Sequence, residues 1–575
     1  MRYAHEVGKV RAAERALMAR LPEGTLMQRA AAGLASVCAR VLPAVYGSRV
    51  VLLVGGGDNG GDTLHAGARL ARRGARVHAV RAGSKIHEAG LADLRAAGGR
   101  LLGGGEEAAI AGADLIIDGL TGIGGSGGLR EPHAAYAALA SESAGIVVAC
   151  DVPSGVDAGS GRVAGTAVHA DVTVTFGTHK PGLLIDPGAS YCGVVELVDI
   201  GLGRDLPDPD VVAARPVDVQ PPEPGPESDK YRRGVVGILA GGDEFTGAAV
   251  LSAGGAVRGG AGMVRFASVA HPVELVRHRW PEVVTTVIEP GRAKILERIG
   301  RVQAWVVGPG LGTGAAAESL VEAVLTTDLP ALVDADGLTV LSRRRDLLRR
   351  AAPTVLTPHA GELSRLIAAT RDDIEAARLD HVRRAAAELS ATVLLKGSTT
   401  LVAEEDRPVR VNPTGTPRLA TAGTGDVLSG LIGALLAGGM PALDAAAAGR
   451  LPARPGRPPG RRPHPPAPNP RSAPKTSSPP SPPPSGPSWC LWRGRRVRRP
   501  GTPDPASPLC SLQCPPPLGL VALHRRALRA IAGIAPTRLA ARFAIAAPAA
   551  GVRWGRWPGS GWRARGRGWS SWRGG

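Results

Sequence analysis

The chain has 575 residues, which is enough for two or three domains with ordinary cores. Its net charge of +19 alone would favour a nucleic-acid or membrane partner, but the charge is concentrated at one end. Residues 451–575 hold 22 Lys and Arg residues and one acidic residue, whereas residues 1–450 have a net charge of −2. We therefore expect no nucleic-acid partner for the first 450 residues.

Cysteine usage and hydropathy indicate a cytoplasmic protein. Cys38, Cys150 and Cys192 lie in apolar or strand-like contexts without metal-ligand spacing, which is typical of reduced, buried thiols. Cys510 and Cys514 have no second pair beside them, so a zinc site is not expected. The N-terminus lacks the apolar core of a signal peptide, and no apolar run approaches the roughly 20 residues of a membrane span. We expect no membrane partner.

Residues 1–218 are predicted to form an α/β domain. Short apolar runs alternate with Ala/Arg/Glu-rich stretches of helical length, a pattern typical of a parallel sheet covered on both faces. This predicts a Rossmann-like, three-layer αβα fold that ends in a Pro-rich linker, with a boundary near residue 220. The predicted strands are Val50–Val54, Val77–Val80, Leu115–Ile117, Ile146–Ala149, Val172–Phe176 and Val194–Val198.

The same alternation resumes in residues 219–449 and predicts a second α/β domain. A helix rich in Ala and Leu follows Asp426 towards Gly438, and we identify no further helix after it. The predicted strands are Val235–Ala240, Met263–Phe266, Ala304–Val307, Ala331–Val333, Thr354–Leu356, Val393–Leu395 and Thr400–Val402.

Residues 450–575 have a different composition, rich in Pro, Arg, Ser and Trp, from which no continuous core can be written. Nearly all Asp and Glu are lost there, as shifted reading of GC-rich codons tends to produce, so we favour out-of-frame translation. A disordered basic tail that binds RNA and an inert linker are the alternatives.

A glycine-rich turn, Gly55–Asp62, follows the first predicted strand and precedes a helical stretch. Glycines let backbone N–H groups approach an anionic ligand at a helix N-terminus, so this is a candidate ligand-binding turn. It is neither a P-loop nor a clean GxGxxG motif, and the alternative is a tight structural turn. Carboxyl ends of parallel strands line one crevice, where Asn59, Asp118, Asp151 and Ser154 can converge as oxygen ligands for a hard cation.

These motifs resemble the NAD(P)H-hydrate epimerase domain. The resemblance rests on Leu26–Ala31, Gly55–Asp62, Asp118–Gly128, Asp151–Asp157 and Phe176–Gly182, and Asp58 and Thr63 stand where the family has Asn and Gly. It implies epimerisation at C6 of a hydrated nicotinamide ring, K⁺ at Asn59, Asp118 and Ser154, and proton handling by Asp151 with Lys180. The implied hydrate contacts are Asp58, Asn59, Gly60, Gly61, Asp62, Gly122, Ile123, Gly124, Gly125, Ser126, Gly127, Gly128 and Asp151.

A second candidate site is the turn Thr421–Asp426, which becomes a helix at its end. Backbone N–H groups of Gly423, Thr424 and Gly425 can stabilise charge on a transferring phosphoryl group, aided by the helix dipole. Asp426 can then take the proton of an attacking hydroxyl. The alternative reading of Asp426 is a helix N-cap.

This half of the chain resembles the ADP-dependent NAD(P)H-hydrate dehydratase, a ribokinase-like fold. The motifs are Gly241–Ala249, Gly308–Gly312, Asp334–Leu338, Thr357–Glu362, Lys396–Thr400 and Asn412–Gly415. The resemblance implies that ADP phosphorylates the C6 hydroxyl and that loss of phosphate restores NAD(P)H, with Mg²⁺ as the phosphate partner. The implied contacts are Ala248, Gly310, Gly312, His359 and Asp426 for the hydrate, and Lys396, Gly397, Ser398, Thr399, Thr400 and Gly425 for the nucleotide.

Some of these residues have a simpler interpretation. His359 can be a loop histidine without a ligand, Lys396 a solvated lysine at a strand end, and Asp334 with Asp336 a structural or Mg²⁺-linked pair. The sequence thus predicts a bifunctional enzyme acting on NADHX and NADPHX with ADP, and it leaves a homo-oligomer open. The alternative is a ribokinase-like small-molecule kinase fused to a non-catalytic nucleotide-binding module.

Overall fold

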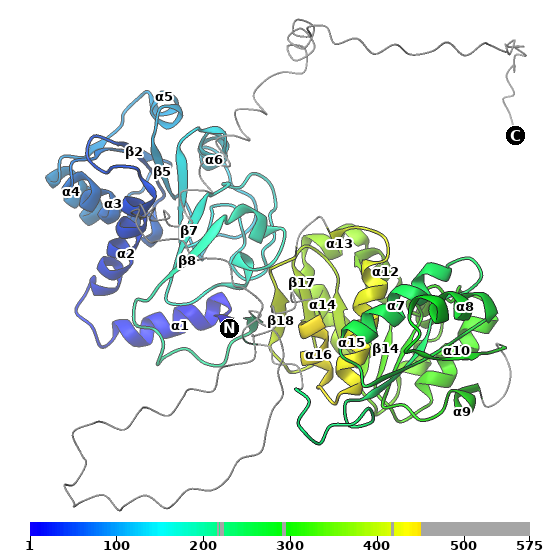
Figure 1. The fold of residues 1–575 in the computed structure, drawn as a ribbon. Helices are drawn as coiled ribbons and strands as arrows, with labels where there is room; N and C mark the ends of the chain where they lie inside the picture. The colour runs from blue at the N-terminus through cyan, green and yellow to red at the C-terminus, as the bar shows by residue number, and fades with distance from the viewer. Residues whose placement is uncertain (215–217, 219–222, 290–294, 416–418, 450–575) are drawn as a thin grey trace, which may run out of the picture. The chain divides into compact units, whose positions relative to one another are not determined.

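The computed structural model describes residues 1–214, 218, 223–289, 295–415 and 419–449. Two sheets, each covered by helices, make up this part of the chain (Figure 1). The predicted two α/β folds are therefore confirmed. The tail 450–575, with Cys510 and Cys514, lies outside the described residues, and the predictions made for it stay predictions.

The first sheet has seven parallel strands in the order β4-β3-β2-β5-β6-β7-β8. In β2, Val50 and Leu52 pack with α1–α4 on one face, while Val51 and Leu53 pack with α5 and α6 on the other. This alternation gives three layers. The strands are β2 (Arg49–Val54), β3 (Arg76–Arg81), β4 (Arg100–Leu101), β5 (Leu115–Gly119), β6 (Ile146–Cys150), β7 (Val172–Phe176) and β8 (Val194–Val198). The helices are α1 (Val7–Met18), α2 (Thr25–Val41), α3 (Asp58–Ala71), α4 (Glu88–Ala96), α5 (Glu106–Ala111) and α6 (His133–Glu142), with the short 3-10 turns η1 (Pro181–Leu183) and η2 (Gly188–Tyr191).

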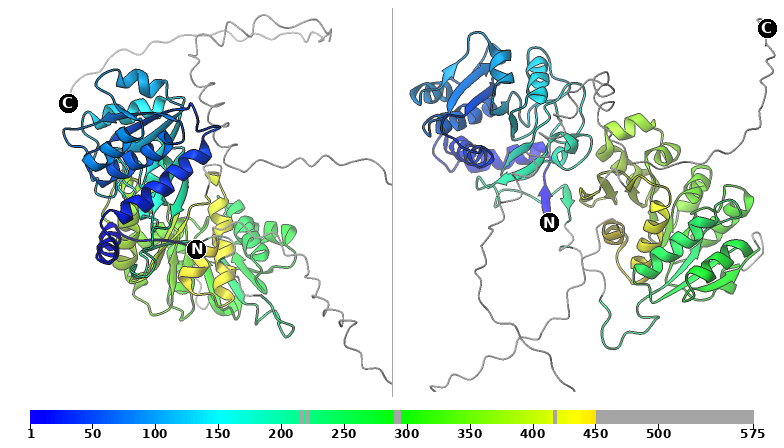
Figure 2. Two further views of the ribbon diagram at one scale, coloured as in Figure 1. Left: turned by 90° about the vertical axis from the view of Figure 1, so that its left-hand side faces the viewer. Right: turned by 45° about the horizontal axis from the view of Figure 1, so that its top comes forward.

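The second sheet has eleven strands in the order β1-β9-β18-β17-β16-β15-β14-β13-β10-β11-β12. Helices α9–α14 pack on one face, and α7, α8, α15 and α16 pack on the other (Figure 2). The strands are β1 (Arg2–Ala4), β9 (Val211–Ala213), β10 (Val235–Leu239), β11 (Met263–Ser268), β12 (Val284–Val287), β13 (Ala304–Val307), β14 (Ala331–Val333), β15 (Thr354–Leu356), β16 (Thr392–Leu395), β17 (Thr400–Ala403) and β18 (Val409–Asn412). The helices are α7 (Thr246–Arg258), α8 (Ala270–Arg279), α9 (Ile295–Ile299), α10 (Ala315–Leu325), α11 (Asp336–Arg343), η4 (Arg345–Leu348), α12 (Ala360–Leu366), α13 (Arg371–Ala376), α14 (Arg378–Leu389), α15 (Thr424–Ala437) and α16 (Ala442–Gly449).

Chain order reverses at one strand in each sheet. Strand β2 lies between β3 and β5, and β10 lies between β11 and β13. A crevice forms outside the carboxyl ends of the strands at such a switch point, because consecutive connections leave in opposite directions. The predicted site segments follow β2, β5, β6 and β7 in the first sheet, and β10, β13–β16 and β18 in the second.

The N-terminal residues also contribute to the second sheet. Strand β9 pairs in parallel with β18, and β1 pairs antiparallel with β9. Leu184 and Ile185, which follow η1, are buried in the apolar cluster that contains Leu395 and Leu401 of β16 and β17. Strands β1 and β9 thus precede the predicted boundary near residue 220 in the sequence, although both belong to the second sheet.

One helix follows the Asp426 helix, although the sequence analysis identified none. Helix α16 buries Ala442, Leu443, Ala445 and Ala446 in the same cluster as α7 and α15. Five of its eight residues are Ala, so its periodicity is weak and it was missed. The free cysteines Cys38, Cys150 and Cys192 are buried, as predicted. No helix in the described ranges is long and apolar enough to cross a membrane.

Close packing of α7 against α15 predicts a stability difference between two glycines. A Cβ on Gly430 of α15 would lie 1.9 Å from the carbonyl oxygen of Ser252 in α7, whereas a Cβ on Gly247 of α7 would meet nothing within 4 Å. Gly430→Ala should therefore lower the free energy of unfolding by about 1–3 kcal/mol or more, because backbone must move. Gly247→Ala should leave it unchanged or raise it by up to ~1 kcal/mol. Thermal unfolding of both variants checks this, and equal melting temperatures would contradict it.

Candidate active sites at the ends of the parallel strands

Asn59, Asp118 and Ser154 lie together at the carboxyl edge of the first sheet. Asp118, at the end of β5, is fully buried and accepts hydrogen bonds from the Ser154 backbone N–H at 2.8 Å and from Ser154 Oγ at 2.7 Å. The Asn59 amide nitrogen donates to the carbonyl oxygens of Thr121 at 2.9 Å and Cys150 at 3.1 Å. These bonds link the segments that follow β2, β5 and β6.

The donor set of this cluster suits a hard cation of low charge. Burial raises the pKa of Asp118 to about 6, although the Ser154 and Leu120 hydrogen bonds oppose the shift. The other groups are neutral oxygens, namely Ser154 Oγ, the Thr121 carbonyl oxygen and Asn59 Oδ1. The amide nitrogen of Asn59 already donates to two carbonyl oxygens, which fixes the orientation of the amide group. One carboxylate among neutral oxygens fits K⁺ better than a transition metal.

A buried ion pair stands beside this cluster. Lys180 Nζ, fully buried, donates to Asp151 Oδ1 at 2.5 Å, to Thr175 Oγ1 at 3.0 Å and to the Phe176 carbonyl at 3.1 Å. Asp151 has a φ of 64°, which is rare for a residue other than glycine. The surrounding bonds thus hold its carboxylate against Lys180 in a strained backbone.

The glycine-rich turn becomes the start of α3. Asp58 is exposed there, and burial raises the pKa of Asp62 well above its usual value, with Asp151 and Asp58 adding to the shift. Asp62 Oδ1 is buried without a hydrogen-bond partner. Thr63 is fully buried, and its hydroxyl packs against Gly119. Its side chain therefore points into the interior and not into the ligand side of the turn.

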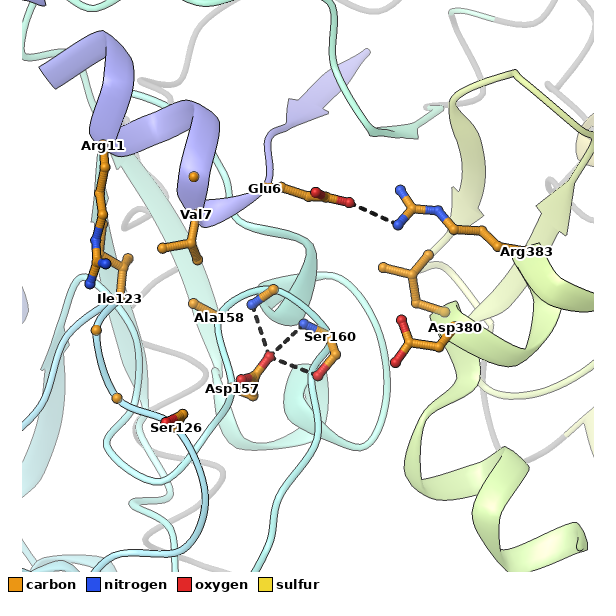
Figure 3. A pocket seen from close by; sticks show the side chains of 15 residues that line it. Glu6, Val7, Arg11, Ile123, Ser126, Asp157, Ala158, Ser160, Asp380 and Arg383 are labelled. Carbon is orange, nitrogen blue, oxygen red and sulfur yellow. Dashed lines mark hydrogen bonds and ion pairs between the residues drawn. The ribbon is translucent and has the colours of Figure 1, made fainter. Parts of the chain in front are cut away.

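Helix α1 brings charged groups to this site that the sequence analysis missed. Burial raises the pKa of Glu14, while the charge of Lys180 lowers it and that of Asp151 raises it. Arg11 lines a cleft of about 440 Å³ with Ile123 and Ser126, two of the predicted hydrate contacts (Figure 3). Both residues lie on an ordinary amphipathic helix, and no local motif marks them.

Other charged side chains line the same cleft. The Arg383 guanidinium of α14 pairs with Glu6 at 2.9 Å, and Asp157 Oδ1 accepts hydrogen bonds from Ser160 N–H and Oγ, both at 2.7 Å (Figure 3). The complete lining is Glu6, Val7, Gly8, Arg11, Ile123, Gly124, Gly125, Ser126, Asp157, Ala158, Gly159, Ser160, Leu379, Asp380 and Arg383. Cations and acids are therefore interspersed around the cleft.

Asp426 lies in the first turn of α15, which is preceded by Gly423 in the left-handed region at φ 87°. Burial raises the pKa of Asp426 to about 6, with a further rise from Asp334, an opposing effect of Lys396 and a smaller rise from Asp336. A carboxyl group with this pKa is deprotonated at neutral pH and still basic enough to accept a proton. Gly423 occupies the N-cap position of α15, so Asp426 is not the N-cap residue.

Lys396 is the cation of this second site. Its ammonium lies 2.9 Å from Asp334 Oδ1 and 3.5 Å from Glu362 Oε2, and its side chain is 17% exposed. Burial alone would lower the pKa of Lys396, but the two carboxylates raise it above its ordinary value. A Cβ on Gly425 would lie 3.6 Å from Lys396 Nζ, so the turn faces this ammonium. Lys396 is therefore not a solvated lysine at a strand end.

His359 has a structural role in addition to any ligand role. It caps α12 in a capping box: its Nδ1 accepts from the Glu362 N–H at 3.1 Å, and its own N–H donates to Glu362 Oε2 at 2.8 Å. Its side chain is 57% exposed, which leaves the ring open to a ligand. Partial burial of the ring lowers the pKa of His359 from its ordinary value, so the imidazole is neutral at neutral pH.

Two of the other predicted hydrate contacts lie side by side. A Cβ on Gly310 would lie 2.9 Å from the Cβ of Ala248 and 2.9 Å from Phe245, which is 56% exposed. Gly310 and Gly312 have φ values of 65° and 77°, and the Gly312 N–H donates to Asp336 Oδ2 at 2.9 Å. Asp336 thus supports the loop after β13, which is a structural role.

The loop Lys396–Thr400, between β16 and β17, is the predicted nucleotide contact. Arg378 of α14, 3% exposed, donates to the carbonyl oxygens of Lys396 at 3.0 Å and Thr399 at 3.2 Å. Sequence analysis missed Arg378, because an arginine at the start of a helix carries no signal of such contacts. The loop is held in place by a buried guanidinium.

Comparisons with known proteins find relatives of both halves of the chain. A family model described as YjeF-related protein N-terminus matches residues 23–182, and one described as NAD(P)H-hydrate dehydratase matches residues 236–454. The bifunctional NAD(P)H-hydrate repair enzyme Nnr of Mycobacterium tuberculosis is 50% identical over 456 residues, covering 78% of this chain and 92% of that protein. The enzyme of the same name from Mycobacterium leprae is 49% identical over 454 residues, covering 78% and 91%.

Among solved structures, an ADP/ATP-dependent NAD(P)H-hydrate dehydratase from Bacillus subtilis is 29% identical, with a TM-score of 0.35 and coverage of 40% of this chain and 82% of that chain. The two family models together match most of the described residues, in the order expected from the sequence. By its identity to the mycobacterial proteins over nearly their whole length, the chain belongs to the family of bifunctional NAD(P)H-hydrate repair enzymes.

Proposed function

We propose that this protein repairs hydrated NADH and NADPH in two steps, epimerising the R and S hydrates at its first site and dehydrating the S hydrate with ADP at its second. The observation that carries the proposal is the second site. There a carboxylate of raised pKa, Asp426, lies in the first turn of a helix after a glycine turn that faces the Lys396–Asp334 pair. That arrangement suits phosphoryl transfer to a hydroxyl.

The dehydration follows from the chemistry of a poor leaving group. Asp426 accepts the proton of the C6 hydroxyl as its oxygen attacks the terminal phosphorus of ADP, and AMP leaves. The phosphate then leaves C6 as a proton is lost from the ring, which restores NAD(P)H. Lys396 and the N–H groups around Gly425 stabilise the negative charge on the transferring phosphoryl group. Mg²⁺ supplies further neutralisation of phosphate charge when bound.

Epimerisation requires the C6–O bond to break and to re-form on the other face of the ring, with a proton given to the departing hydroxyl and taken from the returning water. We assign this role to Asp151 and Lys180, because their pair is fixed by Thr175 and its charges act on Glu14 of α1, the helix that also carries the cleft residue Arg11. Arg11 offers a cation to the pyrophosphate of the hydrate. K⁺ held by Asn59, Asp118 and Ser154 would add positive charge near the ring without taking part in proton transfer.

This proposal also specifies the substrates and the location of the enzyme. The substrates are NADHX, NADPHX and ADP, and the enzyme works in the cytoplasm without a nucleic-acid or membrane partner. Asp58, exposed at the start of α3, adds a negative charge to the helix N-terminus that a phosphate of the hydrate would approach. We therefore infer that the epimerase step is weaker than in proteins with asparagine there.

The full chain incubated with R-hydrate, ADP and Mg²⁺ should restore the absorbance of the dihydronicotinamide ring. Success with the S-hydrate but not with the R-hydrate would leave only the dehydratase. If neither hydrate reacts and a small vitamin-like alcohol is phosphorylated instead, the alternative of a small-molecule kinase fused to a binding module holds.

The pKa of Asp426 predicts the pH dependence of dehydration. Only the deprotonated carboxylate can accept the hydroxyl proton, so kcat/KM for the S-hydrate should fall as pH falls through about 6. Below that pH the fall should approach tenfold per unit, and Asp426→Asn should lose about 10²–10⁴-fold in kcat. Binding of ADP, measured by calorimetry over the same range, serves as the control for titration of its phosphates. A flat profile between pH 5 and 7 with tight ADP binding would contradict the role of Asp426.

Removal of the buried pair should separate the two activities. Asp151→Asn should slow epimerisation by about 10²–10⁴-fold, with dehydration of S-hydrate within twofold of wild type. It leaves Lys180 charged and unpaired in the interior, which costs about 3–5 kcal/mol of stability. The double variant Asp151→Asn/Lys180→Met removes both charges and should recover stability but not epimerisation. Epimerase activity in the double variant would contradict the assignment.

A further inference from the structure

The loop Lys396–Thr400, called the nucleotide loop below, is held from two sides. On one side Arg378 donates to its carbonyl oxygens and is itself fixed by an ion pair with Glu375 at 2.5 Å. These bonds fix the backbone of the nucleotide loop but leave the Ser398 and Thr399 hydroxyls without a partner from α14. Those two side chains are held by a residue that lies more than 200 positions earlier in the chain.

That residue is Asp186. Its Oδ2 accepts a hydrogen bond from the Thr399 backbone N–H at 3.2 Å, from Thr399 Oγ1 at 3.2 Å and from Ser398 Oγ. Its own backbone N–H lies 3.0 Å from Thr399 Oγ1. One carboxylate thus gathers a backbone donor and two hydroxyls of the nucleotide loop. Hydrogen bonds to an ionised acceptor are stronger than neutral ones.

Asp186 is placed by the hydrophobic residues before it. Leu184 is 2% exposed and Ile185 fully buried, and both pack in the cluster that contains Leu395, the last residue of β16 before the nucleotide loop. Thr399 is 6% exposed, so water competes little for its bonds. The carboxylate therefore approaches the loop from a segment that is anchored in the core of the second sheet.

We propose that Asp186 is a positioning residue that preorganises the nucleotide loop for ADP, so that a segment of the epimerase half completes the nucleotide site of the dehydratase half. This rests on the proposed role of Lys396–Thr400 in binding ADP. A loop that is already ordered loses less conformational entropy when the nucleotide binds. The hydrogen bonds of Asp186 go to Ser398 and Thr399 and not to Asp426, the Lys396–Asp334 pair or the glycine turn, so chemistry after binding should be little affected.

The test uses the full chain with Asp186→Ala and the near-isosteric Asp186→Asn. With Asp186→Ala, the KM for ADP with S-hydrate and the Kd for ADP by calorimetry should both rise about tenfold, equivalent to ~1.4 kcal/mol. The kcat should stay within twofold, as should R-to-S epimerisation measured with separate dehydratase added. Asp186→Asn should give a smaller rise, because its amide oxygen still accepts a bond from the loop.

A matched control is Asp199→Ala. Asp199 is an exposed aspartate of the same half whose Oδ1 accepts a backbone N–H, that of Gly201, at 2.8 Å. Its removal deletes the same kind of bond away from the nucleotide loop and should leave the KM for ADP unchanged. In a Thr399→Val background, Asp186→Ala should cost less than in wild type, since one of the three bonds of its carboxylate is already lost.

Several outcomes would overturn the proposal. An unchanged KM for ADP in Asp186→Ala would do so, as would a fall in kcat at constant KM. Tighter ADP binding would show that the carboxylate repels the nucleotide. Equal loss of both activities with a lower melting temperature would show a purely structural role. If wild-type protein binds no ADP, the nucleotide site itself is wrongly assigned, and that failure appears before any substitution is made.

Discussion

Both sites are organised around a buried pair of a lysine and an aspartate at the end of a parallel strand. Removing two charges from water is costly, and such a pair persists only if additional hydrogen bonds satisfy its groups. Lys180 and Asp151 share Thr175, and Asp334, which pairs with Lys396, also accepts from Ser429 Oγ at 2.6 Å. These fixed charges set the environment of the acids beside them, including Asp426.

The second sheet depends on residues from both ends of the described chain. Strands β1 and β9 extend it beyond β18, and Ile185 fills its core. Separating the chain near residue 220 would therefore expose the edge of β18 and leave a cavity beside Leu395. If residue 220 lay in a linker between two independent domains, separating the chain there would leave both cores intact. The position of Asp186 is the local result of the same arrangement.

Strands of the sheet interiors could be predicted because each is a short run of β-branched and apolar residues, and Val172–Phe176 and Ala304–Val307 match the structure. Strands β1 and β9 could not, because they are short and pair with strands that are distant in sequence. Strand β18, which pairs with the preceding strand β17, was missed because it has only four residues. The approach of Asp118 to Ser154 was expected from the strand-end rule. Glu14 and Arg378 lie on ordinary helices, where only tertiary contacts reveal what they touch.

Asp118 and Asp426 show that one pKa is compatible with two roles. Burial raises the pKa of each to about 6. Both oxygens of Asp118 accept bonds from Ser154 or Leu120, so a proton from a substrate would displace bonds that hold the ends of β5 and β6 together. Asp426 is half-buried in the first turn of α15, next to the glycine turn. On the contacts of the carboxylate oxygens, rather than on the pKa, we therefore propose Asp118 for cation binding and Asp426 for proton transfer.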